Sequence, residues 1–249
     1  MAILCYHSVD PKWSSPLAVT PGEFERHCVW LARRGVVPLE VAVKRSPGSA
    51  PVALTFDDGF AELFDHAFPV LVRFGLPATL FVVGRTLTDP PIPVDWVDDP
   101  PARPLRTLTS EQVLEMRDVG IAFGSHSASH RDLATLGEEE VVRDLRESRE
   151  TLEDLLRTPV AFVAYPRGRH NEHVRRAAHR AGFSHGFSLP EHREPTGPYA
   201  VPRVGVYRGN GVRTLWLKCR PQYLRLRTSP MYSTVRRVAG RPGPRRSRE

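Results

Sequence analysis

Short apolar runs alternate with longer segments in which apolar residues recur every three or four positions along this 249-residue chain. The apolar runs are typical of buried strands, and the recurring pattern is typical of amphipathic helices. Glycines directly follow several of the helical patterns and mark their ends. We predict strands at residues 2–6, 52–56, 78–83, 121–123, 160–164, 183–189 and 201–207, and helices at residues 21–34, 61–74, 110–119, 138–157 and 173–181.

A strand followed by a helix, repeated about six or seven times, predicts a parallel α/β architecture. We expect a closed or partly closed β/α barrel resembling a TIM barrel, and a doubly wound open sheet is the alternative. In both, polar residues at the carboxyl ends of the strands form the active site. Residues 85–106, rich in Pro and Asp, and residues 191–198 interrupt the alternation and predict loops. Phe187 and Trp216 are expected in the core.

The composition, with 41% hydrophobic and 25% charged residues, is that of a folded protein and excludes wholesale disorder. No apolar run approaches the length needed to span a membrane, and the N-terminus does not resemble a signal peptide. Cys5, Cys28 and Cys219 are too few and too scattered for a disulfide framework or a CxxC zinc site. We therefore predict a reducing, cytoplasmic location.

The net charge of +7 is concentrated at the C-terminus, where residues 236–249 contain six Arg and one Glu and so contribute +5. The rest of the chain carries only +2, which argues against a folded nucleic-acid-binding face. We expect one domain at residues 1–220, followed by a basic, disordered tail at residues 221–249. Such a tail could contact phosphates or an anionic membrane surface.

Two adjacent carboxylates, Asp57 and Asp58, directly follow the apolar run 52–56. Their mutual repulsion is costly unless a cation or a shared proton offsets it. Neighbouring residues of an extended backbone point to opposite sides, so one carboxylate can bind a metal while the other stays free as a base. The alternative is an ordinary strand followed by an Asp-Gly turn at Gly59.

Two histidines, His126 and His130, follow the predicted strand 121–123. Residues four apart share one face of a helical turn and can converge on one ion. Two surface histidines at a helix start are the alternative. Combined with Asp58, these histidines predict a site with two His ligands and one carboxylate, which leaves positions open for water and substrate.

The segments Thr55-Phe56-Asp57-Asp58-Gly59 and His126-Ser127-Ala128-Ser129-His130 resemble the first two motifs of the polysaccharide deacetylases, the NodB-homology or carbohydrate esterase family 4 group. The resemblance extends over residues 2–220 and implies a distorted β/α barrel of about seven strands. It also implies metal-dependent removal of N-acetyl groups from sugars. In that family Asp57 would be the base, and Asp58, His126 and His130 would bind the metal.

The third motif of the family, usually Arg-x-Pro-Tyr-Gly, departs from its pattern here and reads Ala164-Tyr165-Pro166-Arg167-Gly168. The Arg that normally steadies the base is therefore missing, and Arg203 is the candidate to replace it from a neighbouring strand end. A surface salt bridge is the alternative for Arg203. The resemblance places Tyr165, Pro166 and Arg167 at the substrate, with the backbone N–H of Arg167 as an oxyanion donor.

The late Leu-x-x-His motif of the family stands at the front of this chain as Leu4-Cys5-Tyr6-His7. This arrangement resembles a permuted subgroup that includes biofilm poly-N-acetylglucosamine deacetylases. The resemblance assigns His7 as the general acid, and a capping or core histidine is the alternative.

These features predict a hydrolase that removes the acetyl group from an N-acetylhexosamine in a glycan or glycoconjugate. The expected cofactor is a divalent metal, with Zn²⁺ favoured and Co²⁺, Ni²⁺ or Fe²⁺ also suited to the ligands. Trp96, in the predicted loop, can stack on a sugar ring or simply anchor the loop. The alternatives are a metal-dependent amidase acting on a small non-sugar substrate and a carbohydrate-binding protein with a relict site. No nucleic-acid partner is expected.

Overall fold

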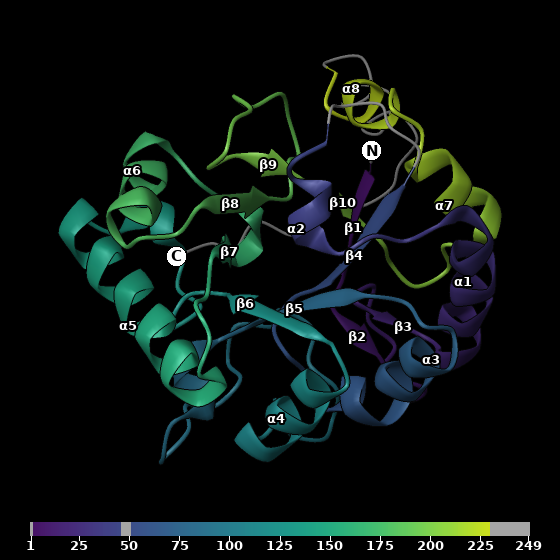
Figure 1. The fold of residues 1–249 in the computed structure, drawn as a ribbon, viewed down its shortest axis with the longest axis horizontal. Coiled ribbons are helices and arrows are strands. Elements are labelled where there is room, and N and C mark those ends of the chain that lie inside the picture. Colours follow the sequence, from purple (N-terminus) through teal and green to yellow (C-terminus); the bar gives the residue numbers. More distant parts are fainter. Residues whose placement is uncertain (1, 46–50, 230–249) are drawn as a thin grey trace.

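Eight strands form one parallel sheet in the computed structural model, which describes residues 2–45 and 51–229 (Figure 1). Parallel strands need crossover connections, and helices supply most of them here. The order in the sheet is β10-β1-β4-β5-β6-β7-β8-β9, and β2 pairs separately with β3. The strands are β1 (Ala2–Tyr6), β2 (Ser8–Val9), β3 (Ala18–Val19), β4 (Val52–Phe56), β5 (Ala78–Val82), β6 (Ala122–Ser125), β7 (Phe162–Ala164), β8 (His185–Ser188), β9 (Val201–Pro202) and β10 (Val204–Gly205).

The two ends of the sheet are joined by one short stretch of chain. β9 pairs with β8, β10 pairs with β1, and only Arg203 separates β9 from β10. The segment 201–205 therefore occupies a single position around the barrel and closes it. This arrangement confirms the predicted distorted barrel with seven strand positions, and it excludes the open doubly wound sheet.

Most helices surround the barrel and cover its outer face (Figure 1), whereas Leu39 and Ala42 of one short helix pack into the apolar cluster inside the barrel. The helices are α1 (Pro21–Arg34), α2 (Leu39–Ala42), α3 (Phe68–Arg73), α4 (Ser110–Asp118), α5 (Glu138–Leu156), α6 (Glu172–Arg180), α7 (Val212–Lys218) and α8 (Tyr223–Arg227).

Helix boundaries follow local capping chemistry. At the start of α1, Thr20 and Glu23 form a reciprocal capping box, which satisfies backbone N–H groups that have no partner inside the helix. At its end, Gly35 takes a left-handed φ of 86°. Both boundaries agree with the predicted helix at residues 21–34.

The predicted helix at 61–74 is instead a π-helical turn at Leu63–Ala67 followed by α3. Pro69 lacks the N–H that an uninterrupted α-helix needs at this point, so regular α-helical structure starts only at Phe68.

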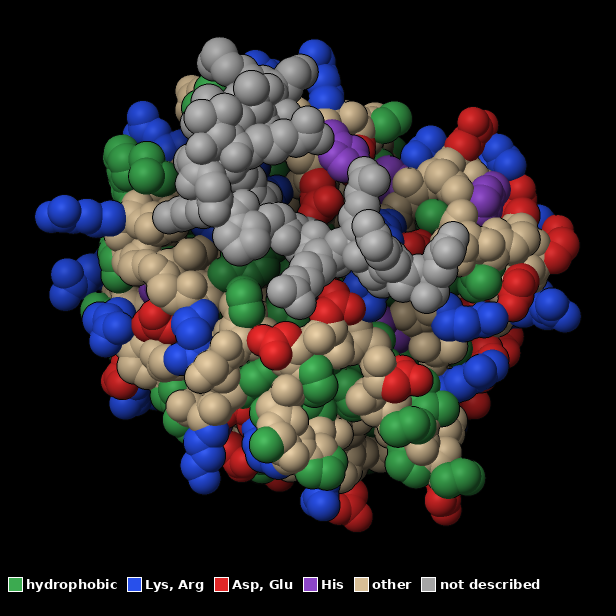
Figure 2. All heavy atoms as spheres, turned by 180° about the vertical axis from the view of Figure 1, so that it is seen from behind, with side chains coloured by type: hydrophobic (Ala, Val, Ile, Leu, Met, Phe, Trp, Pro, Cys, Tyr) green, Lys and Arg blue, Asp and Glu red, His purple; other side chains and the backbone are tan. Residues whose placement is uncertain are grey.

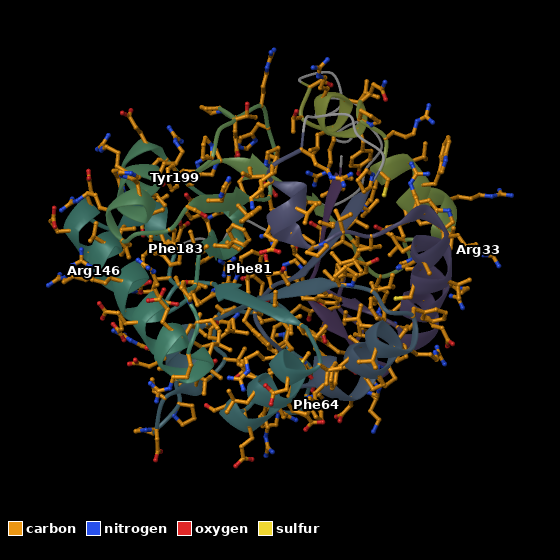
Figure 3. The ribbon with its side chains drawn as sticks, viewed as in Figure 1. Arg33, Phe64, Phe81, Arg146, Phe183 and Tyr199 are labelled. Carbon is orange, nitrogen blue, oxygen red and sulfur yellow. The ribbon has the colours of Figure 1, made fainter. Side chains whose placement is uncertain are left out.

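Side chains fill the inside of the barrel. Ile3, Ala53, Phe81 and Phe187 belong to one buried apolar cluster, which confirms the core position expected for Phe187. Figure 3 shows Phe81 at the centre of the barrel. The core position expected for Trp216 is wrong, because α7 turns Leu215 inward and leaves Trp216 41% exposed.

Two further predictions concern the domain boundary near the C-terminus and membrane-spanning segments. The domain boundary after residue 220 stays a prediction: α8 lies in the range expected as tail, and residues 230–249 lie outside the described residues. Within residues 2–45 and 51–229, no helix has both the length and the apolar character to cross a bilayer. The cytoplasmic location likewise stays a prediction.

Candidate active site at the carboxyl ends of the strands

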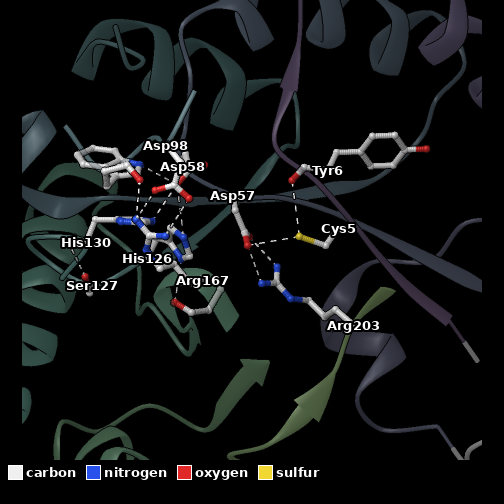
Figure 4. A network of polar contacts seen from close by, with 12 residues as sticks. Cys5, Tyr6, Asp57, Asp58, Asp98, His126, Ser127, His130, Arg167 and Arg203 are labelled. Carbon is white, nitrogen blue, oxygen red and sulfur yellow. Dashed lines mark hydrogen bonds and ion pairs between the residues drawn. The ribbon is translucent and has the colours of Figure 1, made fainter. Parts of the chain in front are cut away.

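The polar residues singled out in the sequence stand where parallel strands end. His7 follows β1, Asp57 and Asp58 follow β4, and His126 follows β6. Parallel strands present their carboxyl ends at the same side of a barrel, so these side chains meet at one mouth. Figure 4 shows Asp57, Asp58 and both histidines in one network of polar contacts.

Asp58, His126 and His130 form a buried cluster of potential metal ligands. Their ligand atoms all lie within 4.8 Å of one another. Asp58 Oδ1 is 3.1 Å from His130 Nε2 and 3.6 Å from His126 Nε2. One carboxylate oxygen and two imidazole nitrogens are a donor set suited to Zn²⁺ and other divalent transition metals.

The protonation of His126 explains why a cation fits this cluster. Its Nδ1 lies 2.9 Å from the backbone oxygen of Ala164, so Nδ1 carries the proton and donates it there. Burial, with further contributions from His130 and Arg203, lowers the pKa of His126 to about 4. The neutral ring therefore turns the lone pair of Nε2 toward the carboxylate of Asp58. Two electron-rich groups facing each other in a buried space are stabilised by a cation between them.

The two histidines converge through a strained loop rather than the expected helical turn. Ser127 and His130 have left-handed φ values of 64° and 56°, and Asp58 has a φ of 68°. The two aspartates thus diverge because Asp58 is left-handed, not because the backbone is extended. Left-handed conformations are costly for residues other than Gly, and such strain gathers at functional sites.

Asp144 of α5 holds the histidine loop in place. It accepts hydrogen bonds from the backbone N–H of Ala128, at 2.9 Å, and from the hydroxyl of Ser129, at 2.5 Å. Ser127 accepts a hydrogen bond from the backbone N–H of His130 at 2.9 Å. The strained loop conformation is therefore maintained by hydrogen bonds from a neighbouring helix and from within the loop.

Asp57 forms a buried, bidentate ion pair with Arg203. The guanidinium donates to both carboxylate oxygens at 2.6 and 2.7 Å, and a third hydrogen bond of 3.1 Å joins it to the hydroxyl of Thr55. Burial opposes ionisation of Asp57, but Arg203 outweighs it and holds the pKa of Asp57 well below its usual range. Arg203 is itself 1% exposed, which excludes the surface salt bridge considered for it.

Cys5 is a neighbour of Asp57 that the sequence analysis did not single out. Its thiol donates to Asp57 Oδ2 at 3.3 Å, and burial together with Asp57 raises its pKa well above the usual value. Ile3 and Cys5 alternate along β1, so both point into the barrel. That period of two could have identified Cys5 from the sequence.

His7 lies on the same side of the site as Cys5 and Asp57. Ligand atoms of these three residues lie within 4.8 Å of one another. His7 is half-buried, and its Nδ1 has no hydrogen-bond partner within the described part of the chain. An imidazole beside an ionised carboxylate at the mouth of the barrel is suited to proton transfer.

The predicted loop at 85–106 lies over the metal-ligand cluster. The indole of Trp96 stacks on His130, with ring centroids 4.6 Å apart, and its N–H donates to Asp58 Oδ1 at 3.1 Å. Arg167 donates to the backbone oxygen of Trp96 at 2.9 Å and forms a 3.3 Å ion pair with Asp98. Asp98 was not recognised in the sequence, because nothing local distinguishes it from the other loop acids.

Not every residue expected at the substrate reaches the site. Tyr165 is fully buried, and its hydroxyl donates to the backbone oxygen of Tyr199 at 2.9 Å, on the outer side of the sheet. Pro166 begins a short 3₁₀ turn at Pro166–Gly168 and is also buried. Arg167, in the middle of that turn, has a left-handed φ of 58° and is the member of the three whose side chain reaches the loop over the site.

Comparisons with known proteins agree with this architecture. A family model described as polysaccharide deacetylase matches residues 44–186. YxkH of Bacillus subtilis is 29% identical over 222 residues, covering 84% of this chain and 72% of YxkH. A poly-beta-1,6-N-acetyl-D-glucosamine N-deacetylase of Staphylococcus aureus is 24% identical over 204 residues, covering 75% and 67% of the two chains. The solved structure of Streptococcus pyogenes deacetylase PplD in complex with acetate superposes with a TM-score of 0.71 at 23% identity, covering 92% of this chain and 98% of PplD.

Proposed function

The chain belongs to the polysaccharide deacetylase family, and from this we propose that it is a metal-dependent N-deacetylase acting on a glycan or glycoconjugate built from N-acetylhexosamine. The observation that carries the proposal is the meeting of two groups of residues at one barrel mouth. An ionised carboxylate beside a histidine lies next to a buried Asp-His-His cluster. We place the catalytic domain at residues 1–220.

We assign Asp58, His126 and His130 as the metal ligands, because their donor atoms converge and His126 presents an unprotonated nitrogen to Asp58. Zn²⁺ fits the donor set well, and Co²⁺, Ni²⁺ and Fe²⁺ accept the same ligands. The chemistry that such a metal supplies when bound is polarisation of the amide carbonyl and acidification of water.

Asp57 is proposed as the general base. Arg203 holds its carboxylate ionised and oriented, so Asp57 can accept a proton from the water that attacks the amide carbon. The new C–O bond places negative charge on the carbonyl oxygen, and the backbone N–H of Arg167 is assigned as a donor to it.

His7 is proposed as the general acid. When the C–N bond breaks, the departing sugar amine needs a proton, because a deprotonated amine is a very poor leaving group. His7 lies on the Asp57 side of the site and donates that proton. The products are acetate and a free amino sugar.

The substrate proposal rests on the family and on one relative. The Staphylococcus aureus relative is named for its action on poly-beta-1,6-N-acetyl-D-glucosamine, so oligomers of β-1,6-linked N-acetylglucosamine are the first substrates to test. Trp96 and Arg167 are proposed to contact the sugar next to the acetamide, because both lie in the cover of the site.

The test combines metal content with acetate release from β-1,6-linked N-acetylglucosamine oligomers. We expect about one zinc per chain in the zinc-loaded protein, loss of both metal and activity in His130→Ala, and retained metal with lost turnover in His7→Ala. His192→Ala, which removes an exposed histidine, serves as the control.

Wild-type protein that binds no metal would overturn the proposal and favour a relict carbohydrate-binding site. Metal binding accompanied by hydrolysis of small acyl amides, but of no sugar, would favour the amidase alternative.

A further inference from the structure

The net positive charge of this chain comes from its C-terminal part. Residues 195–248 contain 13 Lys and Arg and no Asp or Glu, whereas residues 1–194 contain 22 Lys and Arg against 27 Asp and Glu. A long segment with cations only is suited to contact with a polyanionic surface. The described part of this segment includes α7 and α8, which pack against each other on the outside of the barrel.

An apolar groove lies between α1 and α7 and remains open to solvent. It has a volume of about 430 Å³ and is lined by Trp30, Val212, Arg213, Trp216 and Leu217. Leu217 is 52% exposed, so this face of α7 presents a large apolar side chain beside the half-exposed Trp216. Neighbouring exposed apolar side chains on a folded domain mark a surface that contacts another protein, a ligand or a membrane.

Arginines accompany the apolar residues of this groove. The guanidinium of Arg34 lies 5.2 Å from the ring centroid of Trp30, and that of Arg220 lies 4.8 Å from the ring of Trp216. α8, which contacts α7, carries the 61% exposed Leu226 next to Arg225. Seen from behind in Figure 2, many Lys and Arg side chains project from the edge formed by α1 and α7, on the left.

We propose that this face docks onto the surface of an anionic lipid membrane. We call it the lipid-docking patch, and it consists of Trp30, Trp216, Leu217 and Leu226 together with Arg213 and Arg225. The tryptophans and leucines would enter the boundary between headgroups and acyl chains, and the arginines would contact lipid phosphates. Aromatic rings with a polar edge are well suited to that boundary.

Two other occupants fit the patch less well. A nucleic acid or an acidic polysaccharide would pair with the arginines but would leave Leu217 and Leu226 in contact with water. A second copy of this chain would bring two faces of the same positive charge together, which opposes association. A lipid surface satisfies the charged and the apolar side chains at the same time.

The test measures co-sedimentation of the full chain with vesicles of phosphatidylcholine, with and without phosphatidylglycerol. We expect binding that requires the anionic lipid and weakens as salt is added. Deacetylation of a soluble sugar oligomer is measured in parallel, and we expect it to be unchanged in all patch variants, because no patch residue belongs to the base, the acid, the metal ligands or the cover of the site.

Matched control variants distinguish the contribution of the lipid-docking patch to vesicle binding from the contribution of any exposed apolar or charged residue. Leu217→Ser should weaken binding to anionic vesicles about tenfold or more, because burying a Leu side chain contributes about 1.5 kcal/mol or more. The control is Val119→Ser, since Val119 is 55% exposed and directly follows α4, which lies apart from α7 and α8 (Figure 1). Arg225→Glu should weaken binding about tenfold or more, because each cation near such a surface contributes about 1 kcal/mol, and Arg143→Glu on α5 is its control.

Three results would each overturn the proposal. The first is binding that does not distinguish phosphatidylglycerol vesicles from phosphatidylcholine vesicles, or no binding to either. The second is equal loss of binding in the patch variants and their controls. The third is vesicle-free self-association that Leu217→Ser abolishes, which would identify the patch as an interface between two copies.

Discussion

Replacing Arg203 with Met tests the ion pair that organises the candidate base. Arg203→Met keeps a side chain of comparable length inside the barrel but removes the cation that contacts both oxygens of Asp57. Asp57 is 2% exposed, so water cannot replace the lost partner without reorganising the barrel mouth. The substitution therefore leaves an uncompensated carboxylate in a buried position.

The expected cost is large. At an effective dielectric constant of about 20, opposite unit charges about 4 Å apart attract by about 4 kcal/mol. Removing one partner from a buried ion pair costs about 3–5 kcal/mol in comparable proteins. We expect the free energy of unfolding at neutral pH to fall by about that amount.

The sign of the pH dependence provides a second test. In the wild type, Arg203 depresses the folded-state pKa of Asp57. Its contribution is therefore present above the unfolded pKa of about 3.9 and is lost as the pH falls through the folded pKa. In Arg203→Met, burial without the cation raises the pKa of Asp57, and the protonated carboxyl no longer needs a cation. The difference in the free energy of unfolding between the wild type and Arg203→Met should be largest at neutral pH and should decrease as the pH falls toward about 4.

Urea unfolding of the wild type, Arg203→Met, Asp57→Asn and the double variant measures both effects. We expect a coupling energy of about 3 kcal/mol between Asp57 and Arg203. Arg169→Met is the control, because Arg169 pairs with Asp132 at the surface and should contribute about 1 kcal/mol or less. The reasoning would be refuted if Arg203→Met lowered the free energy of unfolding by less than about 1 kcal/mol. It would also be refuted if the difference in the free energy of unfolding between the wild type and Arg203→Met did not change with pH.

Two further substitutions test the cover of the site and the turn beneath it. Arg167→Met removes the side chain that joins this turn to the loop over the site, so KM for a sugar oligomer should rise about fivefold, the equivalent of one hydrogen bond, with kcat less affected. Arg176→Met, which breaks an exposed ion pair with Glu138 between α6 and α5, should leave KM unchanged, and equal effects in the two variants would contradict the assignment. Gly168→Ala should lower the free energy of unfolding by about 2 kcal/mol or more, because Gly168 has a left-handed φ of 69° and an added Cβ would lie 2.4 Å from the Cβ of Leu189. Thermal unfolding measures this loss, and Gly22→Ala inside α1, where space is available, should be neutral or stabilising.

Features encoded in contiguous segments could be predicted from the sequence. The apolar run at 52–56 and the helical pattern at 21–34 reproduce β4 and α1 at the same boundaries. The alternation of strands and helices indicated a barrel, because parallel strands require crossover connections. Asp58 and His126 could be singled out because each stands just after a strand, and strand ends converge in such a fold. His130 could be singled out by its spacing of four residues from His126.

Other features depend on which strand ends become neighbours. Arg203 and Asp57 are 146 positions apart, and they meet because the segment 201–205 joins the two ends of the sheet. The pairing of β1 with β4, which lie 46 positions or more apart in the sequence, brings Cys5 and His7 beside Asp57. No local pattern encodes these distances, since the closure results from packing of the whole barrel.

The conformations of the loops also could not be predicted from the sequence. The helical turn expected for the histidines is a loop with left-handed residues, stabilised by Asp144 from a helix packed beside it. Tyr165 also follows a strand, but its side chain points away from the barrel interior and is buried in the apolar core outside the sheet. There its hydroxyl donates to the backbone oxygen of Tyr199. The sequence by itself determined the order of the elements and the residue types at the strand ends, because periodicity and capping act over a few residues. Only the tertiary structure decided which of those residues face each other, because burial, left-handed backbone and barrel closure arise when distant segments pack together.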